Sequence, residues 1–385
     1  MSSRHYLDHA SSSPLRPEAA DAIAGWARSG TYGDPGRQHV EGHVVRDAVE
    51  HARNDVAALL GARPREVVFT SGGTEAANTA CSRVRDGAAA PGPMIVSPAE
   101  HAAVRLAARR CGQVVEVGID GVGRIDLERL EDALVERAGR PRPALVHCQW
   151  ANHEVGTVQP VAAVVELSHR HGVAVHVDAC SALGHVRVDA AALGADLVSV
   201  SAHKIGGPPG VGALVVRRPV RVAPLLVGGD QERGRRAGME NVPGILAFGA
   251  VARALASAGA IDEAASHERG RTDALLAAAL AVEGVVAYGD TDDRVPHIVC
   301  LGVAGVEAEA VLLGLDQAGV AVHSGSACSS EAFEPSPVLE AMGVDAHRSI
   351  RVSVGWSTTD DDVEAFARRF AEVVRRLRDL APTTA

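Results

Sequence analysis

The feature that most constrains how this chain can fold is a regular alternation of two kinds of segment between residues 65 and 216. Seven short, mostly apolar runs rich in β-branched residues read as strands, at residues 66–70, 94–97, 114–117, 144–149, 173–178, 197–201 and 212–216. Continuous apolar runs are typical of strands that helices cover on both faces. Amphipathic segments lie between them, at residues 75–84, 101–110, 127–137 and 161–171. The pattern predicts an α/β domain with a largely parallel sheet.

The rhythm changes after Pro219. A stretch rich in glycine and arginine, residues 228–244, leads into Ala-rich helical sequence from residue 245 to about residue 283. A strand, a helix and a final helix follow, at residues 297–303, 307–318 and 360 to about 380. A chain of 385 residues is long enough for two domains, and we expect a second, α+β domain to begin near Ala260.

The charge balance argues against several classes of function. Lysine and arginine total 38 and aspartate and glutamate 48, a net charge of −10 that disfavours direct binding to nucleic acid. The longest stretch without a charged side chain has 14 residues, at 317–330, whereas a membrane-spanning helix needs roughly 18. The first residues lack a basic start followed by an apolar run, so no secretory signal is expected. The predicted location is cytoplasmic, without membrane contact.

Six cysteines are widely spaced and form no Cys-x-x-Cys pair. Neither a disulfide framework nor a zinc finger is predicted, and no metal site is expected. Burial as a small hydrophobic residue is the ordinary role of each. Cys328 is the exception, because it lies among small residues in the longest uncharged stretch. That setting favours an exposed thiol, which as a thiolate would be a nucleophile.

A Gly-rich turn, residues 71–74, lies between a predicted strand and a predicted helix. The free N–H groups and the dipole of a helix N-terminus bind phosphate, and the hydroxyl of Thr74 would add a further contact. The alternative is an ordinary strand–helix turn that Thr74 caps.

Two charged residues stand at the ends of predicted strands. Asp178 ends the run at 173–178, at the edge where α/β proteins bind ligands, and a protonated heterocyclic nitrogen would pair with it; the alternative is a cap of the next turn. Lys204, the only lysine in the chain, follows the run at 197–201. An amine can lose its proton and form a Schiff base, whereas a guanidinium cannot. The alternative is a surface lysine retained by chance.

Together these features match the requirements of pyridoxal phosphate. That cofactor needs a helix dipole for its phosphate, an acidic partner for its pyridine nitrogen and a lysine for its aldehyde. The acidic partner keeps the ring protonated, and therefore an effective electron sink. The sequence predicts pyridoxal phosphate as the cofactor, in a Schiff base on Lys204.

From residue 6 to the C-terminal helix, the chain resembles the cysteine desulfurases of the class V aminotransferase superfamily, which have the fold-type I architecture. The matching motifs are FTSGGTE (69–75), AEHAAV (99–104), NHEVGTVQP (152–160), HVDA (176–179), SAHKIGGPPGVGAL (201–214), RRAGMENVPG (235–244), SGSACSS (324–330) and SIRVSVG (349–355). The resemblance implies an α/β large domain, residues 15–259, with a mostly parallel seven-stranded sheet. Residues 1–14 and 260–385 would form a smaller domain that carries the cysteine on an extended loop.

The resemblance also assigns roles by position. Lys204 would hold the cofactor, and His101 would stack on its ring and transfer protons. Arg351 would bind the substrate carboxylate through a bidentate pair. Cys328 would attack the sulfur of the bound cysteine, keeping a persulfide while alanine is released. The cofactor-binding residues would be Gly73, Thr74, His101, His153, Asp178, Ser181, Ser201, His203 and Lys204. The alternatives are a polar residue that starts a helix, for His101, and a surface charge beside a helix, for Arg351.

Four positions depart from the family pattern. His153 replaces an asparagine, and Ser181 replaces a glutamine near the ring hydroxyl. Met239 replaces a threonine that reaches the phosphate bound in the neighbouring subunit. Methionine cannot donate a hydrogen bond to that phosphate. Asp34 replaces an asparagine near the substrate, and we keep it as a candidate substrate contact.

The resemblance implies a pyridoxal-phosphate-dependent L-cysteine desulfurase, active as a homodimer, which passes sulfur to an acceptor protein. An iron–sulfur protein is one candidate acceptor. The departures are similar to those of desulfurases dedicated to DNA phosphorothioation. The alternatives are a desulfurase for iron–sulfur cluster assembly or tRNA thiolation, an enzyme like selenocysteine lyase, and an inactive sulfur-transfer scaffold.

Overall fold

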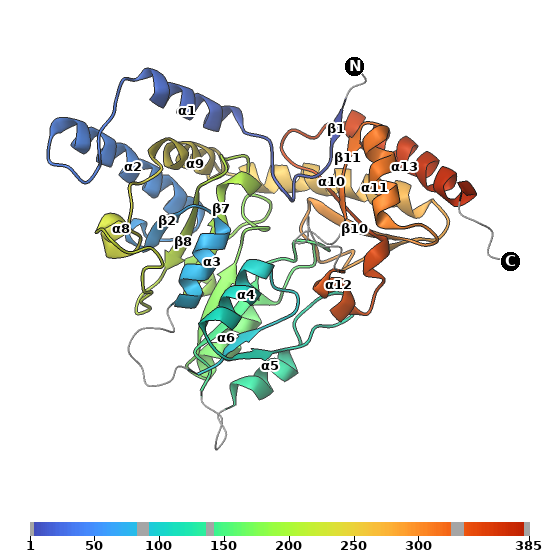
Figure 1. Ribbon diagram of the computed structural model, residues 1–385, viewed down its shortest axis with the longest axis horizontal. Helices are drawn as coiled ribbons and strands as arrows, with labels where there is room; N and C mark the ends of the chain where they lie inside the picture. The colour runs from blue at the N-terminus through green and yellow to red at the C-terminus, as the bar shows by residue number, and fades with distance from the viewer. Residues whose placement is uncertain (1–3, 83–91, 136–141, 325–334, 381–385) are drawn as a thin grey trace.

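The computed structural model describes residues 4–82, 92–135, 142–324 and 335–380. A larger part, built on a long sheet, lies beside a smaller part that contains both ends of the described chain (Figure 1).

The larger part is organised around a seven-stranded sheet. From one edge to the other, its strands are β2 (Val67–Thr70), β8 (Gly212–Val216), β7 (Leu197–Ser201), β6 (Ala174–Asp178), β5 (Leu145–Gln149), β3 (Met94–Val96) and β4 (Val114–Glu116). All neighbours run parallel except β8, which is antiparallel to both β2 and β7. These are the seven strands predicted from the apolar runs, and the predicted α/β fold with a mostly parallel sheet is confirmed.

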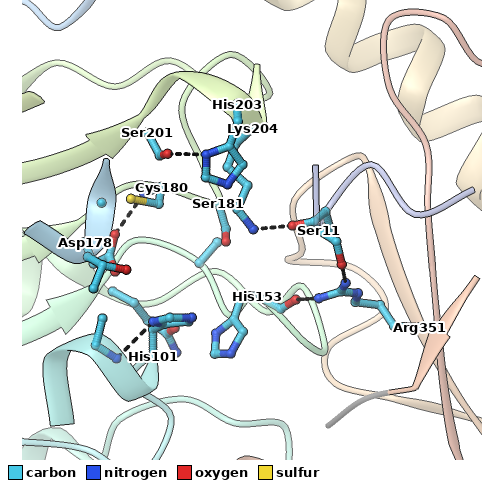
Figure 2. A pocket seen from close by; sticks show the side chains of 16 residues that line it. Ser11, His101, His153, Asp178, Cys180, Ser181, Ser201, His203, Lys204 and Arg351 are labelled. Atoms are coloured by element: carbon cyan, nitrogen blue, oxygen red, sulfur yellow. Dashed lines mark hydrogen bonds between the residues drawn. The ribbon is translucent and has the colours of Figure 1, made fainter. Parts of the chain in front are cut away.

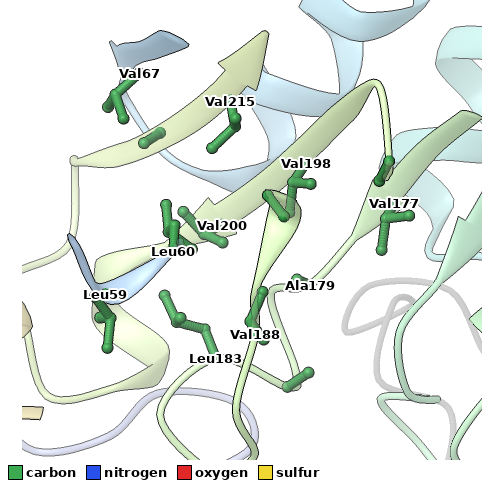
Figure 3. Packing of buried hydrophobic residues seen from close by; sticks show 14 of the residues in the cluster. Leu59, Leu60, Val67, Val177, Ala179, Leu183, Val188, Val198, Val200 and Val215 are labelled. Atoms are coloured by element: carbon green, nitrogen blue, oxygen red, sulfur yellow. The ribbon is translucent and has the colours of Figure 1, made fainter. Parts of the chain in front are cut away.

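Helices cover both faces of this sheet, which explains why its strands are apolar throughout. On one face, Val177, Val198 and Val200 pack in a cluster that includes Leu59 and Leu60 at the end of α2 (Val40–Leu59) (Figure 3). The same cluster receives side chains of α5 (Leu127–Leu134), α6 (Val161–Arg170) and α9 (Val242–Leu255). On the opposite face, strand residues pack against α3 (Gly73–Ser82) and α4 (Ala102–Cys111). Successive strand residues point to opposite faces, so both sets are buried.

The smaller part has a sheet of its own. Its four strands are antiparallel, in the order β12 (His323–Ser324), β13 (Ser349–Ser353), β10 (Ile298–Val303) and β9 (Val285–Tyr288). Near the N-terminus, β1 (His5–Tyr6) pairs in parallel with β11 (Val320–Ala321). Leu7 belongs to a separate apolar cluster with Leu275, Phe366 and Phe370. This second cluster supports the division at residues 14/15 and 259/260, which stays a prediction.

The remaining helices connect or cover these sheets. They are α1 (Pro17–Arg28), α7 (Ala190–Leu193), α8 (Gln231–Gly234), α10 (Ala260–Leu280), α11 (Ala308–Gln317), α12 (Pro337–Met342) and α13 (Asp360–Leu380), with short 3₁₀ turns at Pro64–Glu66, Ala202–Lys204 and Ala346–Arg348.

The Ala-rich helical sequence predicted from residue 245 is two helices. Gly259 adopts φ = +81° between α9 and α10, a left-handed conformation that glycine accepts readily, and the two helices meet at 83°. Among the described residues, no single helix has the length and apolar composition needed to cross a membrane. The bent pair α9–α10 meets that test jointly, on length and composition alone.

Candidate active site

A cavity of about 260 Å³ lies at the carboxyl ends of β5, β6 and β7 (Figure 2). Most of the residues predicted from the sequence line it, namely Gly73, Thr74, His101, His153, Asp178, Ser181, Ser201, His203, Lys204 and Arg351. Asp34 does not: it lines a separate cavity beside Arg37, with which it forms an ion pair of 3.1 Å. Cys328 lies outside the described residues.

Asp178 presents one satisfied and one free carboxylate oxygen. Its Oδ1 accepts hydrogen bonds from the backbone N–H of Cys180 at 3.0 Å and from the hydroxyl of Ser199 at 3.2 Å. Its Oδ2 accepts no hydrogen bond from any side chain or backbone group of the described residues. Burial alone would raise the pKa of Asp178, but His176 and the hydrogen bonds from Cys180 hold it below its usual value. The group is therefore a carboxylate with one oxygen available to a cationic ligand.

Lys204 supplies the amine of the cavity. It ends a 3₁₀ turn that begins directly after β7, and its Nζ donates a hydrogen bond to the carbonyl of Ala10. Burial, followed by the charge of Arg351, lowers the pKa of Lys204 to about 8. A substantial fraction of the amine can thus lose its proton near neutral pH, as attack on an aldehyde requires.

The wall next to Lys204 has the form of an anion site. α3 begins at Gly73, so its first N–H groups have no partners within the helix. A Cβ atom at Gly73 would lie 2.4 Å from Sγ of Cys180, so only glycine fits. Nearby, Ser201 Oγ and His203 Nδ1 are 2.7 Å apart. Burial and the charge of Lys204 lower the pKa of His203 to about 4, so its imidazole is neutral.

His101 starts a helix, as the alternative to its predicted role had it, and it also lines the cavity. Its Nδ1 accepts a hydrogen bond from the N–H of Ala103 at 3.1 Å and so caps α4, while the ring lines the cavity. Nδ1 must be unprotonated to accept this bond, which leaves Nε2 as the position that carries the proton. The rings of His101 and His153 meet edge to face, with centroids 5.0 Å apart.

Arg351 lies at the side of the cavity formed by the smaller part of the molecule. It is on β13 and only 1% exposed, so the alternative of a surface charge is wrong. Its Nη1 donates to the carbonyl of His153 at 2.8 Å, and its Nη2 donates to Asp8 Oδ1 at 2.9 Å and to Ser11 Oγ at 2.6 Å. Three of its five N–H groups thus have partners from its own chain, whereas Nε is buried without a hydrogen-bond partner among the described residues.

Gln149 and Cys180 are among the cavity residues that were not predicted from the sequence. Gln149 ends β5 opposite Asp178, and its Nε2 is buried without a hydrogen-bond partner in the described part of the chain. Its strand-end position is the signal that could have identified it. Cys180 also lines the cavity, but burial, followed by the charge of Asp178, raises the pKa of its thiol well above the usual value. Cys180 is accordingly a thiol and a poor nucleophile.

One cluster of possible metal ligands occurs among the described residues, His185, Glu268 and His297. The two imidazole rings are stacked, with centroids 3.4 Å apart and an angle of 11° between their planes. Imidazole lone pairs lie in the ring plane, so two parallel rings cannot both direct them at one ion. This arrangement does not suit a metal site.

Comparisons with known proteins show which families and structures the chain resembles. The family model described as aminotransferase class-V matches residues 5–366. A protein of Gluconacetobacter diazotrophicus named "Cysteine desulfurase" is 38% identical over 98% of this chain and 95% of its own length. Among solved structures, a "NIFS-LIKE PROTEIN" has a TM-score of 0.88 at 30% identity, covering 97% of this chain and 100% of its own. A structure titled "SspA in complex with cysteine" has a TM-score of 0.78 at 25% identity, covering 91% and 99%.

Proposed function

Because the chain belongs to the class-V aminotransferase family, we propose that it is a pyridoxal-phosphate-dependent L-cysteine desulfurase. The relatives confirm the predicted family, fold class and enzyme class. The observation that carries the proposal is the meeting of three groups in one cavity: the amine of Lys204, the free carboxylate oxygen of Asp178 and the guanidinium of Arg351.

The residues of the cavity fit the cofactor for which the family is known. Asp178 would pair with the protonated ring nitrogen, and Lys204 would attack the aldehyde carbon. The N–H groups at the start of α3, with Thr74, Ser201 and His203, would hold the phosphate. His101 would stack on the ring, and His153 and Ser181 are placed to contact its edge. When bound, pyridoxal phosphate supplies the electron sink that lets the bond between Cβ and sulfur of cysteine break.

The chain's own residues would perform the remaining steps. Arg351 binds the substrate carboxylate, and Lys204 and His101 move protons beside it. The thiolate of Cys328 attacks the substrate sulfur, so that a sulfur–sulfur bond forms as the carbon–sulfur bond breaks. The carbon takes up a proton, and L-alanine leaves while Cys328 keeps the persulfide. The raised pKa of Cys180 supports the assignment of this nucleophile to Cys328.

The test is turnover of L-cysteine to L-alanine and, under reductant, sulfide. Cys328→Ser is expected to abolish sulfide release, whereas the matched variant Cys180→Ser keeps it, because the thiol of Cys180 is protonated. Borohydride treatment should trap the cofactor on Lys204. Turnover by Cys328→Ser at the parental rate would contradict the persulfide assignment. The absence of a trapped adduct would favour the inactive scaffold instead.

We further propose a homodimer. Several large apolar side chains are exposed near the start of α2 and around α8, namely Tyr32, Val40, Val44, Leu225, Leu226, Val227 and Met239. Asp34 and Met239 lie in this region and do not line the Lys204 cavity of their own chain. For them to contact a bound substrate or cofactor, the Lys204 cavity of a second copy would have to lie against this region. Sedimentation analysis tests this: Val227→Asp is expected to shift the protein toward monomer.

The sulfur is proposed to pass to an acceptor protein in the cytoplasm, an iron–sulfur protein being one candidate. The net charge of −10 supports a protein, and not nucleic acid, as the immediate acceptor. The departures at His153, Ser181, Met239 and Asp34 support DNA phosphorothioation as the final destination. Capture of proteins that take sulfur from the persulfidated enzyme tests this against cluster assembly and tRNA thiolation. Comparison of cysteine with selenocysteine as substrates tests the alternative lyase.

A further inference from the structure

Behind Asp178, buried polar side chains cross the large sheet beneath α3. His176 lies two residues before Asp178 on β6, His147 is its register partner on β5, and Ser199 is the partner of Asp178 on β7. All three side chains share the face of Asp178, because strand residues two apart point the same way. His147, His176 and Ser199 are 0% exposed. None of them has a role in the function proposed above.

These side chains form a continuous series of hydrogen bonds. Ser199 Oγ is 3.2 Å from Asp178 Oδ1, and His176 Nε2 is 3.1 Å from Ser199 Oγ. His147 Nδ1 is 2.9 Å from His176 Nδ1. At the far end, Sγ of Cys81, a buried residue of α3, is 3.7 Å from His147 Nε2.

Only one arrangement of protons satisfies every contact. A carboxylate can only accept, so the hydroxyl of Ser199 donates to Asp178 and must itself accept from Nε2–H of His176. A neutral His176 then has a bare Nδ1, which accepts from Nδ1–H of His147. The Nε2 of His147 is left to accept the S–H of Cys81. Every proton in the series therefore points toward Asp178.

The neutrality that this arrangement needs follows from burial. Burial lowers the pKa of His176 to about 4 and that of His147 well below its usual value. Protonation of both rings would place two Nδ1–H groups face to face. Burial also raises the pKa of Cys81, which keeps the thiol protonated.

We propose that Cys81, His147, His176 and Ser199 are a one-way hydrogen-bond relay that fixes the Asp178 carboxylate and stabilises its charge toward the ring nitrogen of the cofactor. Hydrogen bonds in series polarise one another in a buried site, and the relay binds Oδ1 so that Oδ2 stays directed at the ligand. This inference rests on the proposed function, since pyridoxal phosphate is the group that Asp178 would meet. The relay members are positioning residues, because none of them lines the cavity.

The test uses two readouts on the full-length protein. One is the equilibrium affinity of the cofactor-free protein for pyridoxal phosphate. The other is the ¹⁵N NMR signal of the ring nitrogen, in protein loaded with ¹⁵N-labelled pyridoxal phosphate, which reports whether that nitrogen is protonated. Ser199→Ala should weaken binding about tenfold, because it removes a hydrogen bond to a charged group. His147→Leu, two links further away, should weaken it roughly threefold.

Matched variants separate the relay from simple packing. His147→Asn places an amide N–H where Nδ1–H was, so it should restore affinity and the ring-nitrogen signal to near the parental values. Val146→Ala removes a buried side chain from the same strand, and should lower thermal stability without moving either readout. The ring-nitrogen signal should move toward the unprotonated form in both Ser199→Ala and His147→Leu. The shift should be smaller in His147→Leu than in Ser199→Ala.

The outcomes are distinct. Parental affinity and ring-nitrogen signal in both Ser199→Ala and His147→Leu would overturn the relay, as would equal losses in His147→Asn and His147→Leu. Ser199→Ala decides the matter alone if His147→Leu does not fold. Failure of the parental protein to bind pyridoxal phosphate would instead overturn the proposed function, and the role of the relay with it.

Discussion

The two ends of the cavity differ in how their charged groups are satisfied. At the end formed by the large sheet, neighbouring groups bind Oδ1 of Asp178 and leave Oδ2 open. At the end formed by the smaller sheet, Arg351 is bound by Asp8, Ser11 and the carbonyl of His153. The first end is ready to receive a ligand, whereas the second has most of its donors bound and keeps only Nε of Arg351 without a partner among the described residues. Cofactor affinity and substrate affinity should therefore respond to substitutions in different elements.

Lys204 lies between the two ends of the cavity, and its loss should have the largest effect on cysteine turnover. Lys204→Arg keeps a positive charge but cannot form a Schiff base, so cysteine turnover should fall by roughly a thousandfold or more. The cofactor should still bind without a covalent bond, through Asp178 and the start of α3. Absorbance and borohydride trapping measure this. A variant that kept a tenth of the parental turnover would show that the amine is dispensable.

Arg351→Lys tests the end of the cavity formed by the smaller sheet. Lysine keeps the charge but loses the two-pronged geometry that suits a carboxylate, so kcat/KM for L-cysteine should fall about 100-fold, mainly through KM. Cofactor affinity should stay within about twofold of the parental value. Steady-state kinetics and cofactor titration measure the two effects. An equal loss of both would show that the two ends are not separate.

Part of the cavity can be predicted from the sequence, because some of its residues are marked by their position next to a predicted strand. Asp178 and Lys204 could be found because each stands at the end of an apolar strand, and parallel strands bring such ends together. The partners of Arg351 could not be found in this way. Asp8 is 343 residues away from it in the chain, and their contact depends on how β1 and β13 meet in space. The relay was missed for a similar reason, since the pairing of His147 with His176 depends on strand register.

Gln149 belongs to the end that is ready to receive a ligand. Its Nε2 has no hydrogen-bond partner in the described part of the chain and is suited to donate to a ligand. Gln149→Leu should weaken cofactor binding by up to about tenfold, as expected for one lost hydrogen bond in a buried site. KM for cysteine should change less than cofactor affinity. Gln149→Asn is the control, because its shorter amide should recover only part of the affinity. Unchanged affinity in Gln149→Leu would remove this residue from the site.

Asp8→Asn tests whether a partner of Arg351 has to leave. If the substrate carboxylate replaces Asp8, weakening that contact should lower KM for L-cysteine roughly threefold. Thermal stability should fall as well, because Arg351 is buried and loses a charged partner. The exposed ion pair of Arg4 with Asp316 supplies the control variant, Asp316→Asn. It should change neither KM for L-cysteine nor thermal stability. A rise in KM would show instead that Asp8 holds Arg351 in its working position.

Glu100 should affect stability more than turnover, and only over part of the pH range. It is buried, and the backbone N–H of Gln149 donates to its Oε1 at 2.7 Å. Burial raises the pKa of Glu100 from its ordinary value of 4.5 to about 8. Between those values the folded protein holds a proton at Glu100 that the unfolded chain has released, so this group makes stability fall as pH rises through the interval.

Glu100→Gln removes that proton linkage and keeps an acceptor for Gln149. The variant should match the parental protein near pH 4.5 and exceed its stability increasingly up to pH 8. Unfolding midpoints at several pH values, with pyridoxal phosphate at equal saturation, measure this. A difference that does not change with pH would show that Glu100 is ionised in the folded protein, and that this end of the cavity tolerates a second buried charge beside Asp178.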